Sequence, residues 1–343
     1  MNTILIGILL ILTGGCIQQT KQPDSDERTR KIPDAYPLPD SLRNPDELAV
    51  AQIRLGQQLF FDKRLSADAG IACAGCHKPE YAFGDNLPLS AGKDGMAMRR
   101  NTPPLFNLWR HNRFFRDGGV SRLSEVALSA MNEVHELNLP IDTLVRRLRA
   151  LPEYVRAFQE TYRRPPDPYT VTQALMRYQQ SLISADSPYD RYRYRSDSTA
   201  LSTAARRGMQ LYFSDATHCK TCHAGPDFTD GLFHHNGIPE GAMPDTGRAR
   251  ITMRWIDYAR FRTPSLRNLS YTAPYMHDGR YSTLMEVLQH YNRTFNQTRG
   301  ESHPSDLPLT GRNLTEGELN DLQAFLLHLN DSSFIRSTIN HGR

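Results

Sequence analysis

Beyond one short segment near the N-terminus, the 343-residue chain lacks long hydrophobic runs. It also lacks a strong charge imbalance: its formal net charge is +4, and its basic residues are spread along the chain, which argues against nucleic-acid binding. Strand-like alternation is scarce, and only five cysteines are present. The hydrophobic content of 39% and charged content of 23% are ordinary for a soluble globular protein, and the length suffices for two domains.

The N-terminal segment predicts secretion. An apolar run over Ile4–Leu12 is too short to span a bilayer and is followed by Thr13-Gly14-Gly15-Cys16. Residues 1–15 are therefore predicted to be a cleaved signal peptide, with Cys16 as a lipidated first residue similar to that of bacterial lipoproteins. No Lys or Arg precedes the run, and Thr13 stands where the lipoprotein motif prefers Leu, so an ordinary cleaved signal is the alternative.

The polar residues that follow are predicted to form a flexible tether, so that 16–39 is a lipidated N-terminus without its own core. This places the protein in the periplasm, attached to a membrane only by lipid. The outer membrane is favoured over the inner one.

The other four cysteines form two C-x-x-C-H motifs, Cys73-Ala74-Gly75-Cys76-His77 and Cys219-Lys220-Thr221-Cys222-His223. This spacing is typical of c-type haem attachment, in which two thiols bind the porphyrin vinyl groups and the histidine ligates the iron. A zinc site of this kind has pairs separated by about 15–20 residues, whereas these motifs start 146 residues apart (219 − 73). Two short disulfides would leave both histidines unexplained. The sequence therefore predicts two covalently bound haem c groups.

The regions around the two motifs repeat. Matching Asn107 to Asn268 gives an offset of 161 (268 − 107), which also places Asp117-Gly118 on Asp278-Gly279. Upstream, Leu55–Phe61 resembles Arg207–Phe213, each with one glycine that would let a helix or the porphyrin approach closely. Two tandem copies of one haem-binding unit are the simplest interpretation.

Apolar residues recur at helical spacing in six segments, and Thr315 with Glu318 forms a capping box. The predicted helices are Pro45–Asp62, Ile141–Tyr162, Tyr169–Ser184, Leu201–Ser214, Leu284–Thr294 and Thr315–Leu329. The predicted fold class is mostly α, with two tandem cytochrome c-like domains and long loops. The first domain is expected over 40–195 and the second over 196–335.

Several motifs carry a family resemblance. In order, L-G-Q-Q-L-F-F, R-N-T-P-P-L-F-N, T-P-S-L-R-N-L and A-P-Y-M-H-D-G-R, together with the two haem motifs, resemble the bacterial dihaem cytochrome c peroxidases and their MauG-like relatives. The likeness runs from about Asp40 to Leu329. It implies an oxidoreductase that reduces hydrogen peroxide at one haem with electrons passed through the other. The electrons would come from a small cytochrome c or cupredoxin.

Two other functions stay open. A MauG-like protein would use peroxide to oxidise residues of a partner protein. A non-enzymatic electron-transfer cytochrome would have both irons capped by side chains.

The resemblance implies that Tyr291 ligates the second iron, where typical peroxidases of the family have methionine and MauG-like proteins have tyrosine. An anionic phenolate should favour oxidised iron because it stabilises the higher charge. A tyrosine packed on the haem edge, or His290 as the ligand, is the alternative. For the first copy, 291 − 161 = 130, and Ala130 cannot ligate iron.

Peroxidases of the family that need reductive activation have a histidine ligand in the loop after the first motif, and this chain has no histidine between Lys78 and Arg110. Met96 and Met98 are substitutes in principle, although loop methionines more often fill apolar space. The first haem is therefore expected to be five-coordinate and open to peroxide.

The resemblance also implies a glutamate that moves protons during cleavage of the peroxide O–O bond, and by spacing this is Glu136. Glu133 is a rival, and a surface carboxylate without a role is the other alternative. His135 is expected to be a neighbour rather than the acid.

One departure concerns the tryptophan that the family places between its haems as an electron relay. Here the motif is Phe114-Phe115-Arg116-Asp117-Gly118, and arginine cannot be oxidised as a relay. Transfer would then be direct, use Trp109 or Phe115, or be slower.

The family also binds a calcium ion between its domains, and the matching positions are the Asn101 side chain and the carbonyls of Thr272 and Pro274. Oxygen ligands suit calcium. His234-His235 suggests a further metal, but a solvent-facing pair is the simpler expectation.

Overall fold

The computed structural model describes residues 32–238, 244–294 and 313–341. These residues belong to one compact unit that begins at Ile32. The predicted signal peptide over 1–15 and Cys16 lie outside the described residues. Within the described part of the chain, no helix has the length and apolar character needed to cross a membrane.

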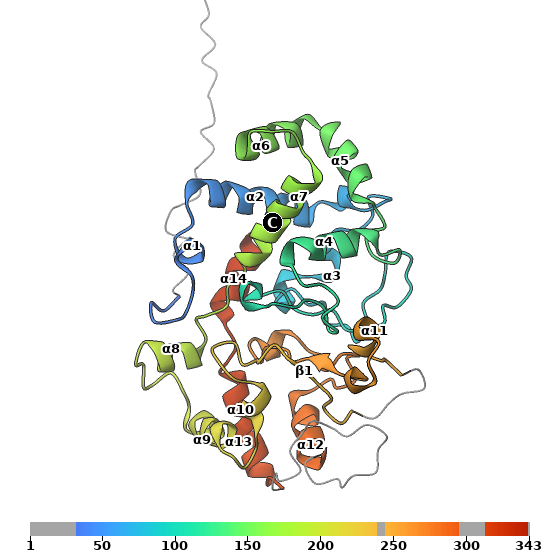
Figure 1. Cartoon of the computed structure of the whole chain (residues 1–343). Helices are drawn as coiled ribbons and strands as arrows, with labels where there is room; N and C mark the ends of the chain where they lie inside the picture. The colour runs from blue at the N-terminus through green and yellow to red at the C-terminus, as the bar shows by residue number, and fades with distance from the viewer. Residues whose placement is uncertain (1–31, 239–243, 295–312, 342–343) are drawn as a thin grey trace, which may run out of the picture. The chain divides into compact units, whose positions relative to one another are not determined.

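Helices dominate the structure, as the sequence predicts, and the two strands are two residues each (Figure 1). The strands β1 (Phe233–His234) and β2 (Phe261–Arg262) pair antiparallel. The α-helices are α1 (Asp40–Arg43), α2 (Glu47–Phe61), α3 (Cys73–Cys76), α4 (Leu123–Asn132), α5 (Ile141–Arg149), α6 (Pro152–Tyr162), α7 (Pro168–Gln180), α8 (Pro188–Tyr194), α9 (Thr203–Phe213), α10 (Cys219–Cys222), α11 (Ala249–Thr252), α12 (Leu284–Thr294), α13 (Glu316–Leu327) and α14 (Ser332–His341). Short 3-10 helices are η2 (Lys63–Leu65), η3 (Pro79–Tyr81), η4 (Leu108–Arg110), η5 (Trp255–Asp257) and η6 (Leu269–Tyr271).

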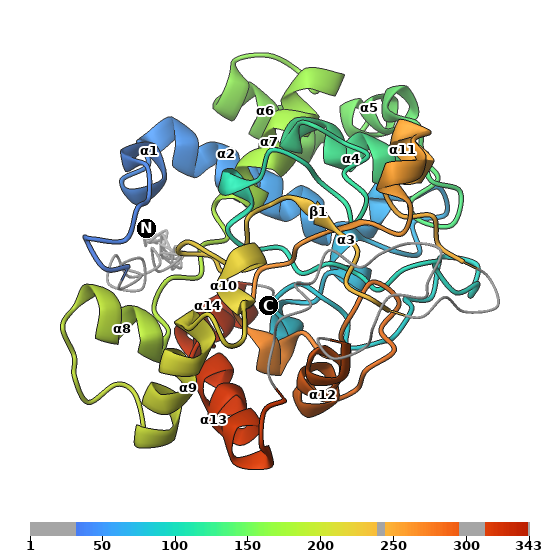
Figure 2. The ribbon, with the colours of Figure 1, turned by 60° about the horizontal axis from the view of Figure 1, so that its bottom comes forward.

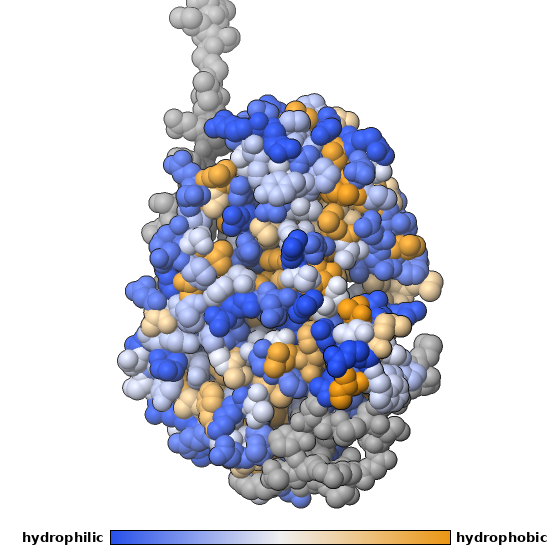
Figure 3. Space-filling view, viewed as in Figure 1, coloured by the Kyte–Doolittle hydropathy of each residue, from blue (hydrophilic) through white to orange (hydrophobic). Residues whose placement is uncertain are grey.

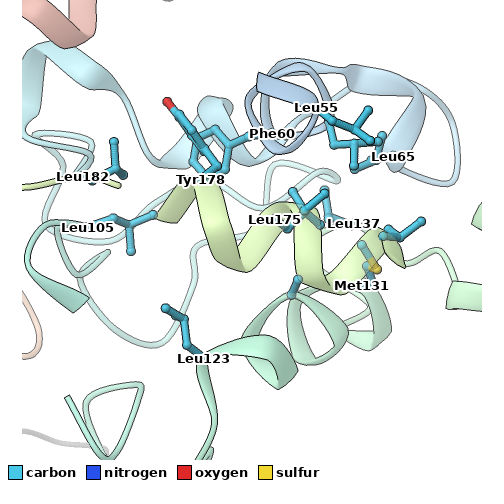
Figure 4. Packing of buried hydrophobic residues seen from close by; sticks show 14 of the residues in the cluster. Leu55, Phe60, Leu65, Leu105, Leu123, Met131, Leu137, Leu175, Tyr178 and Leu182 are labelled. Carbon is cyan, nitrogen blue, oxygen red and sulfur yellow. The ribbon is translucent and has the colours of Figure 1, made fainter. Parts of the chain in front are cut away.

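The first hydrophobic cluster is built on the packing of α2 against α7. Phe60 of α2 meets Tyr178 of α7 with ring centroids 5.2 Å apart, and Figure 4 shows this contact among the buried residues around it. A Cβ atom added at Gly56 of α2 would overlap the carbonyl oxygen of Ala174. Glycine is therefore needed here because a helix backbone, rather than the porphyrin, comes close.

The second hydrophobic cluster repeats this arrangement with α9 and α13, which lie side by side in Figures 1 and 2. Gly208 of α9 faces α13, and a Cβ there would overlap the carbonyl oxygen of Asp321. The capping box of Thr315 and Glu318 at the start of α13 is present as predicted. Each repeat thus uses one glycine to bring two helices into close contact.

The offset of 161 residues also holds in the loops. The bridge between Phe114 and Val120 has its counterpart between Tyr275 and Tyr281, and η4 matches η6 in the same way. Residues with positive φ recur at the same offset. These pairs are Asn107 with Asn268, Phe115 with Met276, and Gly118 with Gly279. Two tandem copies of one backbone unit are therefore visible in the structure.

The last helix does not stay with the second repeat. Phe334 of α14 packs against Phe83 and Phe106 of the first repeat, with both pairs of ring centroids 6.2 Å apart. The chain end and the first repeat consequently share one hydrophobic cluster.

Two local predictions were wrong. The segment 141–162 forms two helices rather than one, because Pro152 has no N–H to continue α5 and restricts the residue before it. Tyr36 and Leu38, predicted to lie in a flexible tether, are buried instead. Tyr36 is 1% exposed, and its hydroxyl donates to Asp227 at 2.7 Å, so the folded part begins before residue 39.

The surface has the mixed character expected from the composition. The face drawn in Figure 3 is mostly hydrophilic, with hydrophobic residues in small separate areas. The most exposed large hydrophobic side chains are near α11 and η5, where Met253 is 87% and Trp255 68% exposed.

Candidate functional site

Each C-x-x-C segment forms a single helical turn, α3 in the first repeat and α10 in the second. The four thiols of Cys73, Cys76, Cys219 and Cys222 are free in the structure, so the alternative of two short disulfides is not found. Two thiols on one turn, followed at once by a histidine, fit the attachment of one porphyrin at each motif.

The two motif histidines are oriented alike. Nδ1 of His77 lies 2.8 Å from the carbonyl oxygen of Phe83, and Nδ1 of His223 lies 3.0 Å from that of Phe228. An Nδ1–H that donates to a carbonyl leaves Nε2 as the unprotonated nitrogen, which is the one that binds a metal. Burial lowers the pKa of both imidazoles and so favours this neutral form. The residues present therefore fit a haem at each site.

Tyr291 of α12 is half-buried beside the second motif. Burial is the main cause that raises the pKa of its hydroxyl to about 12, a hydrogen bond with the Asn236 side chain opposes this, and the nearby thiols of Cys222 and Cys219 add to it. The rival His290 directs Nε2 to the backbone carbonyl of Asn236 at 3.0 Å. Of Tyr291 and His290, it is thus Tyr291 whose hydroxyl interacts electrostatically with the motif cysteines.

The corresponding position in the first repeat is Ala130 on α4, which packs half-buried against the first cluster. Its methyl group has no atom that can ligate iron. Met96, one of two alternative ligands in the preceding loop, is 59% exposed. Met98 is half-buried, and its backbone N–H donates to Ser90 at 2.8 Å. The two repeats therefore differ at the predicted sixth coordination position.

Glu136 lies half-buried in the turn that follows α4. Burial, and then the charge of Glu133, raise its pKa to about 7. Burial raises the pKa of both Cys73 and Cys76, the charge of Asp85 adds to this at Cys76, and the charge of Glu136 makes a smaller contribution at both thiols, so Glu136 lies near the first haem motif. The rivals are placed differently. Glu133 is exposed, and Nδ1 of His135 lies 2.8 Å from a carboxylate oxygen of Asp94 near the surface.

Asn101, the predicted calcium ligand, makes other contacts. Its side-chain oxygen accepts a hydrogen bond from Nη2 of Arg116 at 2.6 Å, and its side-chain nitrogen donates to the Leu87 carbonyl at 2.8 Å. Its backbone N–H donates to the carbonyl of His277 at 2.8 Å, which brings Asn101 against the loop that also contains Thr272 and Pro274. Because a guanidinium already uses the amide oxygen, these residues as arranged do not fit a calcium ion.

The pair His234-His235 is not solvent-facing as expected, because His235 is 5% exposed. Nε2 of His234 lies 2.7 Å from Asp230, and the two residues form a potential metal cluster with Cys222. Cys222 is predicted to be bonded to the porphyrin, so this cluster is part of the second haem site and not a separate metal site.

Sequence reasoning missed Arg267, which is 0% exposed. Its guanidinium donates two hydrogen bonds of 2.7 Å to Asp190, and its Nε donates to the carbonyl of Pro226 at 2.9 Å. It thereby fixes the loop that follows His223. The only signal in the sequence was an arginine at the position of Phe106 in the first repeat (267 − 161 = 106).

Trp109, a suggested relay, packs against the small cluster formed by Tyr36, Leu38, Ile183 and Ala185. Phe115 has a left-handed backbone, with φ of 64°. Nothing in these contacts marks either ring as an electron relay, and the route between the haems stays a prediction.

Comparisons with known proteins agree with this geometry. The family described as di-haem cytochrome c peroxidase matches residues 50–199. The methylamine utilization protein MauG of Methylorubrum extorquens is 35% identical over 295 residues, which cover 84% of this chain and 81% of that protein. The cytochrome-c peroxidase IdrP2 of Pseudomonas sp. (strain SCT) is 34% identical over 314 residues, covering 83% of each.

Solved structures give the same picture. A MauG-like protein associated with microbial copper homeostasis aligns with a TM-score of 0.74 and 30% identity, over 87% of this chain and 93% of that one. The diheme peroxidase BthA from Burkholderia thailandensis aligns with a TM-score of 0.71 over 85% of this chain and 88% of that one. Its identity of 24% shows the fold alone.

Proposed function

Because the chain belongs to the di-haem cytochrome c peroxidase family, we propose that it reduces hydrogen peroxide at one haem with electrons passed through the other. The observation that carries this proposal is the difference between two equivalent positions, Ala130 in the first repeat and Tyr291 in the second. One site is left open to a substrate, and the other is closed by a side chain.

The haems would be attached covalently and held by the motif residues. Cys73, Cys76 and His77 would hold the first, and Cys219, Cys222 and His223 the second. When bound, haem supplies the redox chemistry of peroxide reduction. The carbonyls of Phe83 and Phe228 keep each imidazole ring in the orientation that presents Nε2.

Glu136 would move the proton that peroxide cleavage requires. Reduction of hydrogen peroxide to two waters consumes two electrons and two protons, and one oxygen must lose a proton while the other gains one. A carboxyl group with a pKa of about 7 can accept and return a proton at neutral pH. Its position after α4, on the side of Cys73 and Cys76, supports this role at the first site.

Tyr291 would close the second site. The pKa of about 12 keeps its hydroxyl protonated in the free protein, so ligation must displace this proton to give a phenolate. A negatively charged ligand stabilises the higher positive charge of oxidised iron, which suits a site that stores or delivers an oxidising equivalent.

A MauG-like activity, the peroxide-dependent oxidation of a partner protein, is the second candidate. Tyr291 favours it, as does the absence of histidine between Lys78 and Arg110. Arg116 in place of the family tryptophan weighs against rapid transfer between the haems. For a peroxidase, the electron donor would be a small cytochrome c or cupredoxin. For a MauG-like enzyme, the oxidisable partner protein would itself supply the electrons.

The location of the protein also stays a proposal. The apolar run before Cys16 supports export to the periplasm and attachment by lipid, to the outer membrane rather than the inner one. Fractionation of cells that make the full chain tests this, and recovery in the cytoplasm would contradict it.

Low-temperature EPR of the fully oxidised holoprotein tests the proposed function. We expect one high-spin signal from an open first site and one low-spin signal from a closed second site, with reaction with peroxide in the absence of prior reduction. Two low-spin signals and no peroxide reaction would instead indicate a carrier of electrons. Peroxide turnover with a reduced small cytochrome would indicate a peroxidase. Oxidation of a partner protein, detected by mass spectrometry of that protein, would indicate the MauG-like activity.

A further inference from the structure

Arg116 is half-buried, with the arginines Arg262 and Arg100 nearby. Burial first, and then the charges of Arg262 and Arg100, lower its pKa to about 10, while the charge of Asp278 opposes this, and the guanidinium stays protonated at neutral pH. The nearby carboxylate of Asp117 is already used, because it binds Arg100 at 2.7 Å and Arg250 at 2.6 Å. The strongest contact of Arg116 is consequently with a neutral partner, the side-chain oxygen of Asn101.

The Asn101 amide is held in one orientation. Its nitrogen donates to the carbonyl of Leu87, which directs its oxygen toward Nη2 of Arg116 at 2.6 Å. A second contact runs from Nε of Arg116 to the Asn101 carbonyl at 3.4 Å. The guanidinium therefore reaches two oxygen atoms of the same residue.

This pair also joins the two repeats. The backbone N–H of Asn101 donates to the carbonyl of His277 at 2.8 Å, and the carbonyl of Arg116 accepts from the N–H of Arg262 at 2.7 Å. Asn101 and Arg116 belong to the first repeat, while His277 and Arg262 belong to the second. The Arg116 cation at the Asn101 side chain thus lies where the backbone of the first repeat is hydrogen-bonded to the backbone of the second.

A calcium ion is poorly suited to this place. It binds oxygen at about 2.3–2.6 Å and gains affinity from carboxylate ligands, whereas the expected ligands here are one amide and two backbone carbonyls. An ion within that distance of the Asn101 oxygen would stand beside the Arg116 guanidinium, with Arg100 and Arg262 adding to the repulsion. A charge-assisted hydrogen bond from arginine satisfies the same oxygen without a metal.

We propose that the Arg116 guanidinium takes the place of the calcium ion implied by the family resemblance, so that this protein links its two repeats through a built-in cation and needs no calcium. The substitution that removes the family tryptophan is, in this view, the same one that supplies the cation. The proposal concerns metal dependence and does not depend on which substrate the haems act on.

The first test measures metal in the wild-type holoprotein. The protein is incubated with calcium chloride, desalted and analysed by elemental mass spectrometry, and its thermal unfolding is compared with calcium and with EGTA. We expect far less than one calcium per chain and the same Tm in both conditions. One retained calcium per chain, or a Tm that falls in EGTA, would overturn the proposal.

The second test removes the cation with Arg116→Gln and uses Arg113→Gln, an exposed arginine three residues earlier, as the control. We expect Tm to fall by about 5 °C in the Arg116 variant, because a half-buried charge-assisted hydrogen bond is lost, and calcium to restore part of that loss. The control should keep the wild-type Tm. An Arg116 variant with unchanged Tm and no response to calcium would contradict the proposed link, while the wild-type measurement decides the question even if this variant fails to fold.

Discussion

The two repeats are alike around the haem-motif histidines, and they differ at the predicted sixth coordination position of the iron. In both, the motif histidine directs Nδ1 to the carbonyl of a phenylalanine with a left-handed backbone, Phe83 or Phe228. In both, a glycine lets two helices cross. The differences fall at Ala130 against Tyr291, where one side chain can bind iron and the other cannot. The two copies have therefore kept the residues that would hold a haem, but they differ in the side chain at the predicted sixth coordination position.

A second difference concerns protons. The first repeat has Glu136 with a pKa of about 7. At the same offset, 136 + 161 = 297, the second repeat has Gln297, an amide that does not titrate and that lies outside the described residues. Two substitutions in the first repeat, Ala130→Tyr and Glu136→Gln, would therefore copy the second repeat's residues into it one at a time.

Ala130→Tyr should have the largest effect. A phenol at this position is expected to ligate the first iron, so that the high-spin EPR signal is replaced by a second low-spin signal and reaction with peroxide is lost. Ala130→Phe is the control, because it adds similar bulk next to the first cluster but no ligand atom. If the Tyr variant kept its high-spin signal and reacted with peroxide as the Phe variant does, the equivalence of positions 130 and 291 would be wrong.

Glu136→Gln is expected to lower kcat/KM for peroxide by about 10²–10³-fold, because the proton transfer is lost. Haem content and EPR signals should not change. In the wild type, the rate of reaction with peroxide should rise as pH increases through about 7, since the ionised carboxylate is the base. The Gln variant should lose this rise. Glu133→Gln alters an exposed carboxyl three residues away and should keep the wild-type kcat/KM, with the rise moved to a lower pH because the charge of Glu133 contributes to the raised pKa of Glu136.

Stability separates this role from a structural one. Burial raises the pKa of Glu136 to about 7, so the folded state retains a proton that the unfolded state releases near pH 4–5. Stability therefore falls as pH rises through this window, and above pH 7 the folded protein carries the full penalty of a buried charge. Glu136→Gln removes that penalty, so at pH 8 its free energy of unfolding should equal or exceed that of the wild type. A loss of both activity and stability would indicate that Glu136 supports the fold.

The sequence predicted what depends on local pattern. The offset of 161 residues and the positions of α2, α9, α12 and α13 follow from spacing and periodicity, and the structure reproduces them. Even the two repeated glycines were singled out, although their partner was left open between a helix and the porphyrin. Pro152 marked the break between α5 and α6, but the apolar periodicity on both sides concealed it.

Contacts between distant residues were not predictable in this way. Tyr36 and Asp227 are 191 residues apart, and a short polar segment gives no sign that its tyrosine will be buried. The hydrogen bond from Arg116 to Asn101 likewise depends on loops that the fold brings together. The sequence shows that arginine at 116 departs from the family, but it does not show that Asn101 is the hydrogen-bond partner of this arginine.

The smallest expected effects concern the helix crossings, and they ask how alike the two repeats are in energy. Gly56→Ala and Gly208→Ala each place a methyl group against a helix carbonyl, so each should lower the free energy of unfolding by about 1–3 kcal/mol. Gly317→Ala is the matched control, because nothing lies within 4 Å of a Cβ there, and in helix α13 it should raise stability by about 0.5 kcal/mol. Denaturant unfolding of the three holoproteins measures this. Equal losses would mean that the crossings are equivalent, whereas a loss confined to one variant would show that only that repeat relies on close packing of its two helices.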